Sequence, residues 1–367
     1  MKSLQILSLT IMMAFFACEN KQNQLQPGSL YTDTLFPELK SGEVFYKSKD
    51  PFGEIMELKG KYIPEDTAVF TLSESVMLIN GNFLVMKNLS DPPFRVFRLP
   101  DLKQVNVVGK RGIGPDEFNF PTLVPSQDST ILCYLYENSN NKLYKLNKDG
   151  KAEYCKYPFQ GTDNKGMFAA EKQLVNTGIN DFMYVDNSPS GKSIYRITQK
   201  GDSALVREVF NLGMDPKQKS PFAYIGDFGA NPSKNRMVYA YKYFKIIKFM
   251  DLEAKTIRTI NFEKDEFDES SSHEVNGLDK NITHYWGICA QDDYVYFLYS
   301  GRTPVEVVKE AQKQNYYIFV EQYDWNGNPV KKYKLDQWGY FTVDEKNKKL
   351  YLASMNIDGP FIEYQLP

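Results

Sequence analysis

The side chains best suited to binding or chemistry lie in three separate stretches of the sequence. The first is a loop at residues 109–121, where charged side chains stand among three glycines and two prolines. The other two begin at residues 284 and 338. The candidates are Arg111, Asp116, Glu117, His284, Tyr285, Trp286, Arg302, Trp338 and Tyr340. Aromatic and arginine side chains make rigid contacts at a low entropy cost, so this set favours a binding site for a partner.

Structural roles are the alternative for each candidate. Glu117 can cap the amides of its own glycine-rich loop, and Trp286 can pack between neighbouring repeats. His284 can be a partly buried residue with satisfied hydrogen bonds. The sequence leaves both interpretations open.

A catalytic interpretation requires a nucleophile with a base, or paired carboxylates. The sequence has no Gly-x-Ser-x-Gly motif, and His273 lies in an acidic stretch that suits a solvated histidine. Asp116, Glu117, Asp227 and Asp292 are candidate acids, but spacing alone does not bring two carboxyl groups to one sugar ring. We therefore expect no catalytic residue, and keep a hydrolase or lyase acting on glycans or lactones as the alternative.

Composition excludes several classes of function. The chain of 367 residues has two histidines, which rules out a multi-histidine metal centre. No EF-hand run occurs, and residues 324–328, which resemble one superficially, fit a hairpin turn better. A net charge of −2 and a pI near 5.9 argue against a nucleic-acid partner. We expect no metal and no cofactor.

The elements that position the candidates are β-strands in a repeat. Aromatic residues make up 14% of the chain, which suits pleated, half-buried surfaces. One apolar, alternating strand recurs six times, at steps of 48, 51, 55, 57 and 55 residues. The aligned positions are Leu84, Leu132, Met183, Val238, Val295 and Leu350. A near-constant period of this length predicts a repeat architecture.

Each copy is followed by a second strand, and all but the last are followed by a further strand, in most cases after a polar turn. Four strands to a unit and six units predict an all-β fold, a six-bladed β-propeller with antiparallel blades. A β-sandwich or jelly roll does not account for six copies at one period. The last unit is one strand short, and residues 55–62 are predicted to supply it and close the ring.

Two insertions interrupt the regular period of the repeat. Residues 263–280 are acidic and serine-rich, which predicts a surface loop. A short helix is predicted to about residue 314, with Thr303 as N-cap, Pro304 at N1 and Glu306 at N3. A structural lid and a binding element are both open interpretations of this helix.

The N-terminus has the features of a secretory signal peptide. Its apolar run, from Leu4 to Ala17, is shorter than the roughly 20 residues that a membrane-spanning helix requires. The resemblance of residues 15–18 to a bacterial lipobox implies a lipid on Cys18. We expect a signal peptide at residues 1–17, a lipidated Cys18 with a flexible tether at 18–40, and the propeller at 41–367. Secretion with an unmodified Cys18 is the alternative. The other cysteines, Cys133, Cys155 and Cys289, are too few for a full disulfide framework.

Three segments resemble known families or signals. Gly109-x-x-Gly112-x-Gly114-Pro115-x-Glu117-Phe118-x-x-Pro121 resembles the link between blades in NHL-type propellers. Residues 15–18, Phe-Phe-Ala-Cys, resemble a bacterial lipobox, and residues 323–351 are similar to TolB-like six-bladed propeller lipoproteins of Gram-negative envelopes. The resemblance covers about residues 40–367.

The resemblance implies a fold and a compartment, and no activity. Glu19 after the cysteine implies sorting to the outer membrane, on its periplasmic or cell-surface side. We therefore expect a monomer, anchored to the membrane by lipid at Cys18. Its expected role is to bind an envelope protein, peptide or glycan without catalysis.

Overall fold

The computed structural model describes residues 43–45, 51–63, 75–114, 116–156, 173–262, 267–269, 279–356 and 361–367. The predicted signal peptide and tether, Cys18 and His273 lie outside these ranges, as does most of the predicted loop at 263–280. Within the described part of the chain, no helix has the length and apolar character needed to cross a bilayer.

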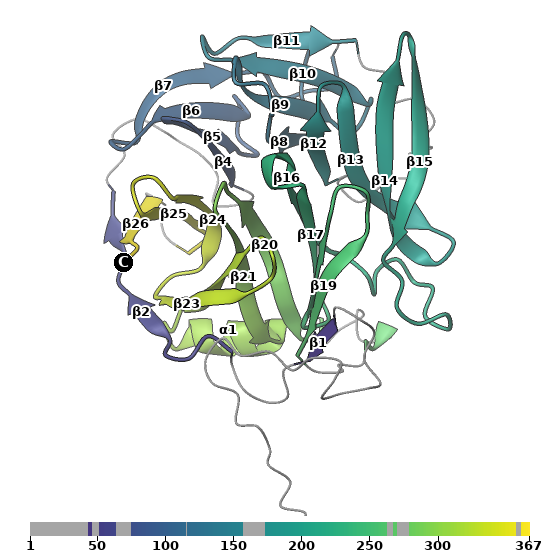
Figure 1. The fold of residues 1–367 in the computed structure, drawn as a ribbon. Coiled ribbons are helices and arrows are strands. Elements are labelled where there is room, and N and C mark those ends of the chain that lie inside the picture. Colours follow the sequence, from purple (N-terminus) through teal and green to yellow (C-terminus); the bar gives the residue numbers. More distant parts are fainter. Residues whose placement is uncertain are drawn as a thin grey trace, which may run out of the picture.

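The described strands form six antiparallel sheets that follow one another around a ring (Figure 1). The first three blades are β4–β7 (Val76–Asn80, Phe83–Lys87, Phe94–Arg98, Lys103–Val108), β8–β11 (Pro121–Val124, Ile131–Glu137, Lys142–Asn147, Ala152–Cys155) and β12–β15 (Leu174–Gly178, Asp181–Ser188, Gly191–Lys200, Ser203–Asn211). The next are β16–β19 (Gly226–Asn231, Arg236–Tyr241, Ile246–Met250, Thr256–Asn261), β20–β23 (Thr283–Ala290, Tyr294–Arg302, Ile318–Asp324, Pro329–Leu335) and β24–β26 (Gly339–Asp344, Lys349–Ser354, Phe361–Gln365). The predicted six-bladed propeller is confirmed.

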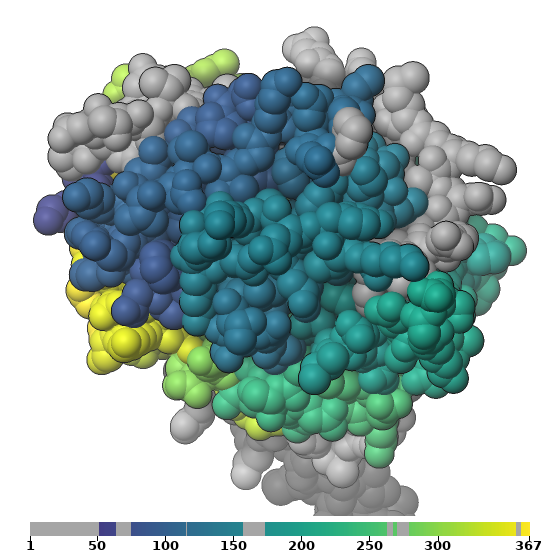
Figure 2. Space-filling view, turned by 90° about the horizontal axis from the view of Figure 1, so that it is seen from above, coloured from purple at the N-terminus to yellow at the C-terminus, as the bar shows by residue number. Residues whose placement is uncertain are grey.

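The first strand of each blade lies innermost and contacts the first strand of the next blade. The contact of β24 with β4 brings the sixth blade against the first. In Figure 2 the yellow residues of the sixth blade lie beside the blue residues of the first.

Three short N-terminal strands add to the outer edges of the last three blades. β1 (Glu43–Phe45) pairs in parallel with β19, and β2 (Met56–Leu58) pairs in parallel with β23. β3 (Lys61–Tyr62) pairs antiparallel with β26 and is the fourth strand of the sixth blade. The stretch predicted as one closing strand is thus divided between two blades. The division falls at Gly60, where a Cβ would collide with the side chain of Ile362.

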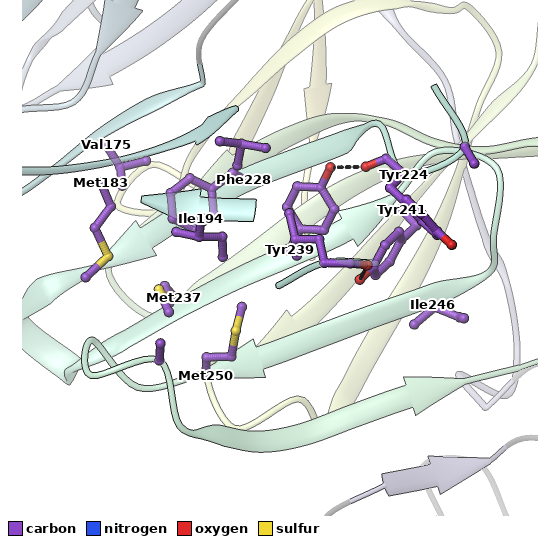
Figure 3. Packing of buried hydrophobic residues seen from close by; sticks show 14 residues of the cluster. Val175, Met183, Ile194, Tyr224, Phe228, Met237, Tyr239, Tyr241, Ile246 and Met250 are labelled. Carbon is purple, nitrogen blue, oxygen red and sulfur yellow. Dashed lines mark hydrogen bonds between the residues drawn. The ribbon is translucent and has the colours of Figure 1, made fainter. Parts of the chain in front are cut away.

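Aromatic and aliphatic side chains fill the space between blades. Figure 3 shows residues of the third and fourth blades in one such cluster, with Ile194 and Phe228 on opposite sides of the interface. The buried Tyr239 hydroxyl donates to the Tyr224 carbonyl at 2.6 Å, and the Tyr241 hydroxyl donates to the Leu212 carbonyl at 2.7 Å. The high tyrosine content thus serves the core, because each phenol buries its ring and still pairs its hydroxyl.

Candidate functional site

All nine candidates belong to one side of the ring, which we call the entry face. It is the side on which the first strand of each blade begins. Because the strands alternate in direction, it carries the links between blades and the connections between second and third strands. The helix α1 (Pro304–Gln312) lies in such a connection, between β21 and β22. Its capping box joins Thr303 and Glu306, as predicted.

The glycine-rich loop at 109–121 connects β7 to β8 and thus links the first blade to the second, as predicted. Glu117 is held inside this loop: its Oε2 accepts from the Gly114 amide at 2.9 Å, and its Oε1 lies 2.7 Å from Lys110 Nζ. The hydrogen bonds from Lys110 and then Gly114 lower the pKa of Glu117. Asp116 is exposed, and the Arg111 amide donates to Asp91 at 3.0 Å. Glu117 therefore stabilises the loop that links the first blade to the second.

His284 and Tyr285 lie in the wall of the fifth blade. Tyr285 is fully buried and donates its hydroxyl to Glu321 Oε2 at 3.1 Å, and burial raises the pKa of Tyr285. The His284 ring stacks on Tyr299 with centroids 6.0 Å apart. Its backbone amide donates to the carbonyl of Lys242 at 2.7 Å, which ties the fifth blade to the fourth.

Trp286, Trp338 and Tyr340 come together between the fifth and sixth blades. The ring centroid of Trp286 lies 5.9 Å from that of Trp338 and 6.2 Å from that of Tyr340. All three side chains are partly exposed. Trp286 lies in β20, Trp338 precedes β24, and Tyr340 lies in β24, so two neighbouring inner strands position the group. We call these three residues the aromatic cluster.

Polar atoms without a partner lie in the segments that flank this junction. Ser300 Oγ, Gln337 Oε1, Trp338 Nε1 and Asn356 Nδ2 are buried and have no hydrogen-bond partner in the described structure. Sequence reasoning missed Ser300, Gln337 and Asn356 as site residues. Ser300 lies in the Tyr299-Ser300-Gly301 segment at the end of β21, and no pattern singles out Asn356.

Arg302 ends β21 and is fixed by the segment that follows α1. Its guanidinium carbon lies 3.9 Å from the ring centroid of Tyr317, and Nη2 donates to the Tyr317 carbonyl at 2.6 Å. Cation–π stacking with a hydrogen bond holds this side chain in one position. Arg302 thus joins the fifth blade to the inserted helix.

The four acids of the catalytic alternative lie apart in the fold. Asp116 and Glu117 precede the second blade, Asp227 begins the fourth, and Asp292 lies in the β20–β21 turn on the opposite face. Asp227 is partly exposed as a residue, but its Oδ2 is buried and lacks a hydrogen-bond partner in the described structure. Burial raises the pKa of Asp227 to about 7, against the opposing charge of Lys242. Among the described residues no group of three or more His, Cys, Asp or Glu side chains is arranged to hold a metal.

A cavity of about 300 Å³ lies between the second and third blades, away from all nine candidates. Its lining includes Tyr134, Lys145, Cys155 and Phe182. Cys133, Cys155 and Cys289 are free thiols in the described structure. The cavity contains none of the aromatic cluster.

Comparison with known proteins relates the chain to other propellers by sequence and by fold. Residues 218–346 match the sequence model of the family described as TolB-like 6-blade propeller-like. No curated protein matches the sequence. A solved member of the DUF4221 family from Bacteroides vulgatus ATCC 8482 is 13% identical, with a TM-score of 0.59 over 85% of this chain and 98% of that chain. A putative exported protein from Bacteroides fragilis NCTC 9343 is also 13% identical, with a TM-score of 0.49 over 84% of this chain and 88% of that one. At these identities the likeness shows the fold alone. The six-bladed ring identifies the chain as a six-bladed β-propeller, and residues 218–346 are similar to the TolB-like family.

Proposed function

We propose that this protein is a lipid-anchored propeller of the bacterial envelope that binds a partner at its entry face without catalysis. The observation that supports it best is the aromatic cluster. Two stretches about 50 residues apart in the sequence place the partly exposed rings of Trp338 and Tyr340 at about 6 Å from that of Trp286. Rigid aromatic side chains with polar groups beside them are typical of binding sites.

The proposed anchor is a lipid on Cys18, which follows the apolar run of the signal peptide. A lipid chain at that cysteine, joined by a polar tether, holds the ring near a membrane without a spanning helix. Incorporation of a labelled fatty acid by the wild type, and its loss in Cys18→Ala, is the expected result. Equal labelling of both proteins would contradict the anchor.

The binding proposal is tested with the full-length protein in detergent micelles. Fractionated envelope glycans and envelope proteins are offered to the wild type, Trp286→Ala and Tyr340→Ala. Tyr154→Ala removes an exposed aromatic ring from the outer strand of the second blade and is the matched control. We expect one fraction to bind the wild type and Tyr154→Ala, and to lose affinity for both cluster variants.

Circular dichroism establishes that all variants are folded. Binding that is unchanged in folded Trp286→Ala and Tyr340→Ala would refute the aromatic cluster as the site. Conversion of a bound fraction to new products would refute the non-catalytic role.

A further inference from the structure

The polar atoms beside the aromatic cluster define the chemistry of its partner. Resting on the function proposed above, we infer that the cluster binds a neutral saccharide. The C–H face of one pyranose ring lies against the Trp286 and Trp338 rings, and its hydroxyl groups pair with Ser300, Trp338 and Asn356.

Ser300 faces the same interface as the cluster. Along β21, Val295, Phe297 and Tyr299 pack on one side of the blade, while Tyr296 and Leu298 pack on the other. Side chains alternate along a strand, so Ser300 continues the row of Leu298. Trp286 and Trp338 pack against the cluster that contains Leu298. Ser300 is 6% exposed, and its Oγ has no hydrogen-bond partner in the described structure.

Asn356 approaches the cluster from the sixth blade, whereas the Gln337 side-chain amide donates to the Tyr62 hydroxyl on β3 at 3.4 Å. Gly339 pairs with Ser354 across β24 and β25, and the Met355 amide donates to the Trp338 carbonyl at 3.4 Å. The next residue, Asn356, therefore lies beside the link that carries Gln337 and Trp338. Its Nδ2 and the Trp338 Nε1 are donors, and the Gln337 Oε1 is an acceptor.

The unpaired atoms form a neutral set of donors and acceptors. Buried polar atoms in native proteins usually have partners, so several together at one junction indicate a bound group that supplies them. A sugar hydroxyl donates and accepts through the same oxygen, which suits a mixed set. Arg302, the cation next to this junction in sequence, also has a buried Nε without a hydrogen-bond partner in the described structure. Tyr317 nevertheless holds its guanidinium through the ring and the carbonyl, so one fixed cation stands beside four uncharged groups. The set thus favours a neutral saccharide over an anionic ligand.

Access to these atoms requires a movement of the rings. The polar atoms are buried while the rings beside them are partly exposed, so a ring must rotate as the saccharide enters. The chain has three tryptophans, and two of them form the site. Trp325 lies on the opposite face and donates to the Gln291 carbonyl at 3.0 Å. Saccharide binding should therefore change the fluorescence of Trp286 and Trp338.

The test titrates the full-length protein in detergent micelles with neutral oligosaccharides from mannan, galactan, glucan and xylan, and with peptides of similar mass. Fluorescence is recorded for the wild type, Ser300→Ala, Trp338→Phe and Trp286→Ala. Ser203→Ala is the matched control, because Ser203 is an exposed residue at the start of β15 in the third blade. Trp325→Phe establishes whether Trp325 contributes to the change in fluorescence.

We expect one oligosaccharide class to bind the wild type, Ser203→Ala and Trp325→Phe with the same affinity. Ser300→Ala and Trp338→Phe should each weaken binding by about five- to tenfold, as the loss of one hydrogen bond does. Trp286→Ala should abolish it. The thermal midpoint of free Ser300→Ala should not fall, because its Oγ has no partner to lose in the described structure.

Peptides that bind in place of saccharides, with loss in Trp286→Ala, would refute the saccharide and leave the proposed function standing. Saccharide binding that is unchanged in Ser300→Ala and Trp338→Phe would refute the polar contacts. Saccharide binding that survives in Trp286→Ala would refute both this inference and the proposed site.

Discussion

The buried ion pair of the fifth blade is the most sensitive point of the scaffold. Lys332 and Glu321 face each other across β22 and β23, with Nζ and Oε1 3.0 Å apart and side chains only 4% and 1% exposed. The other carboxylate oxygen accepts from the hydroxyls of Tyr285 and Tyr323 at 3.1 and 3.2 Å. Lys332 Nζ also lies 4.5 Å from the ring centroid of Tyr299.

The change Lys332→Met keeps most of the side-chain volume and removes the positive charge. It leaves the Glu321 carboxylate buried with two phenol donors and no cation from position 332. Loss of one partner of a buried pair costs about 3–5 kcal/mol. The further change Glu321→Gln removes the stranded charge, so the double variant should recover at least half of that loss. Urea unfolding followed by circular dichroism measures each free energy.

Lys334→Met is the matched control for this experiment. Lys334 lies two residues further along β23, and its Nζ is 2.8 Å from Glu57 on β2. Both side chains of that pair are exposed, so its loss should change stability little. A loss below about 1 kcal/mol in Lys332→Met would place the buried pair in the range of surface pairs and refute the reasoning. A double variant no more stable than Lys332→Met would refute it equally.

Three further predictions concern the entry face. Burial raises the pKa of Asp227 from 3.8 to about 7, so the folded state keeps a proton that the unfolded state releases, and stability falls as pH rises between these values. Asp227→Asn should lack this slope in thermal midpoints at pH 5 and pH 8, and parallel profiles would contradict it. Thr303→Ala removes a side-chain cap, which costs about 1 kcal/mol. Faster amide hydrogen exchange in α1 should follow, and unchanged exchange would count against the cap. The lowered pKa of Glu117 stabilises the fold above its ordinary value of 4.5, and this contribution disappears as pH falls through the lower folded value. Glu117→Gln should therefore lower the thermal midpoint more at pH 7 than under acidic conditions below pH 4.5, whereas an equal drop at both would exclude this origin.

The six blades were predictable because their strands recur along the chain. The alternation of apolar and polar residues around Leu84, Leu132 and the later aligned positions indicates a strand that is buried between two neighbouring blades. The split of residues 55–62 was not predictable from the same pattern. Met56–Leu58 and Lys61–Tyr62 read as one alternating run, and the change of sheet at Gly60 depends on contact with Ile362, about 300 residues away.

The candidate site was predictable only in its aromatic part. Trp286, Trp338 and Tyr340 stand at the starts of neighbouring inner strands, where a ring of blades brings side chains together. Tyr285 was predicted to belong to the same site, but it packs on the opposite face of the blade from Trp286, because adjacent residues on a strand point to opposite faces. No sequence pattern marks Ser300 as a site residue. Its proposed role follows from an Oγ that is buried and has no hydrogen-bond partner in the described structure.

The N-terminal strands also determine how the ring would bear a mechanical load. A pull applied at the N-terminus meets β1 first, then β2, and only then the β3–β26 pair that completes the sixth blade. β1 and β2 are short strands on outer edges, so they can peel away in sequence while the blades keep their own four strands. The chain thus places two short edge strands, β1 and β2, ahead of the β3–β26 pair that completes the sixth blade.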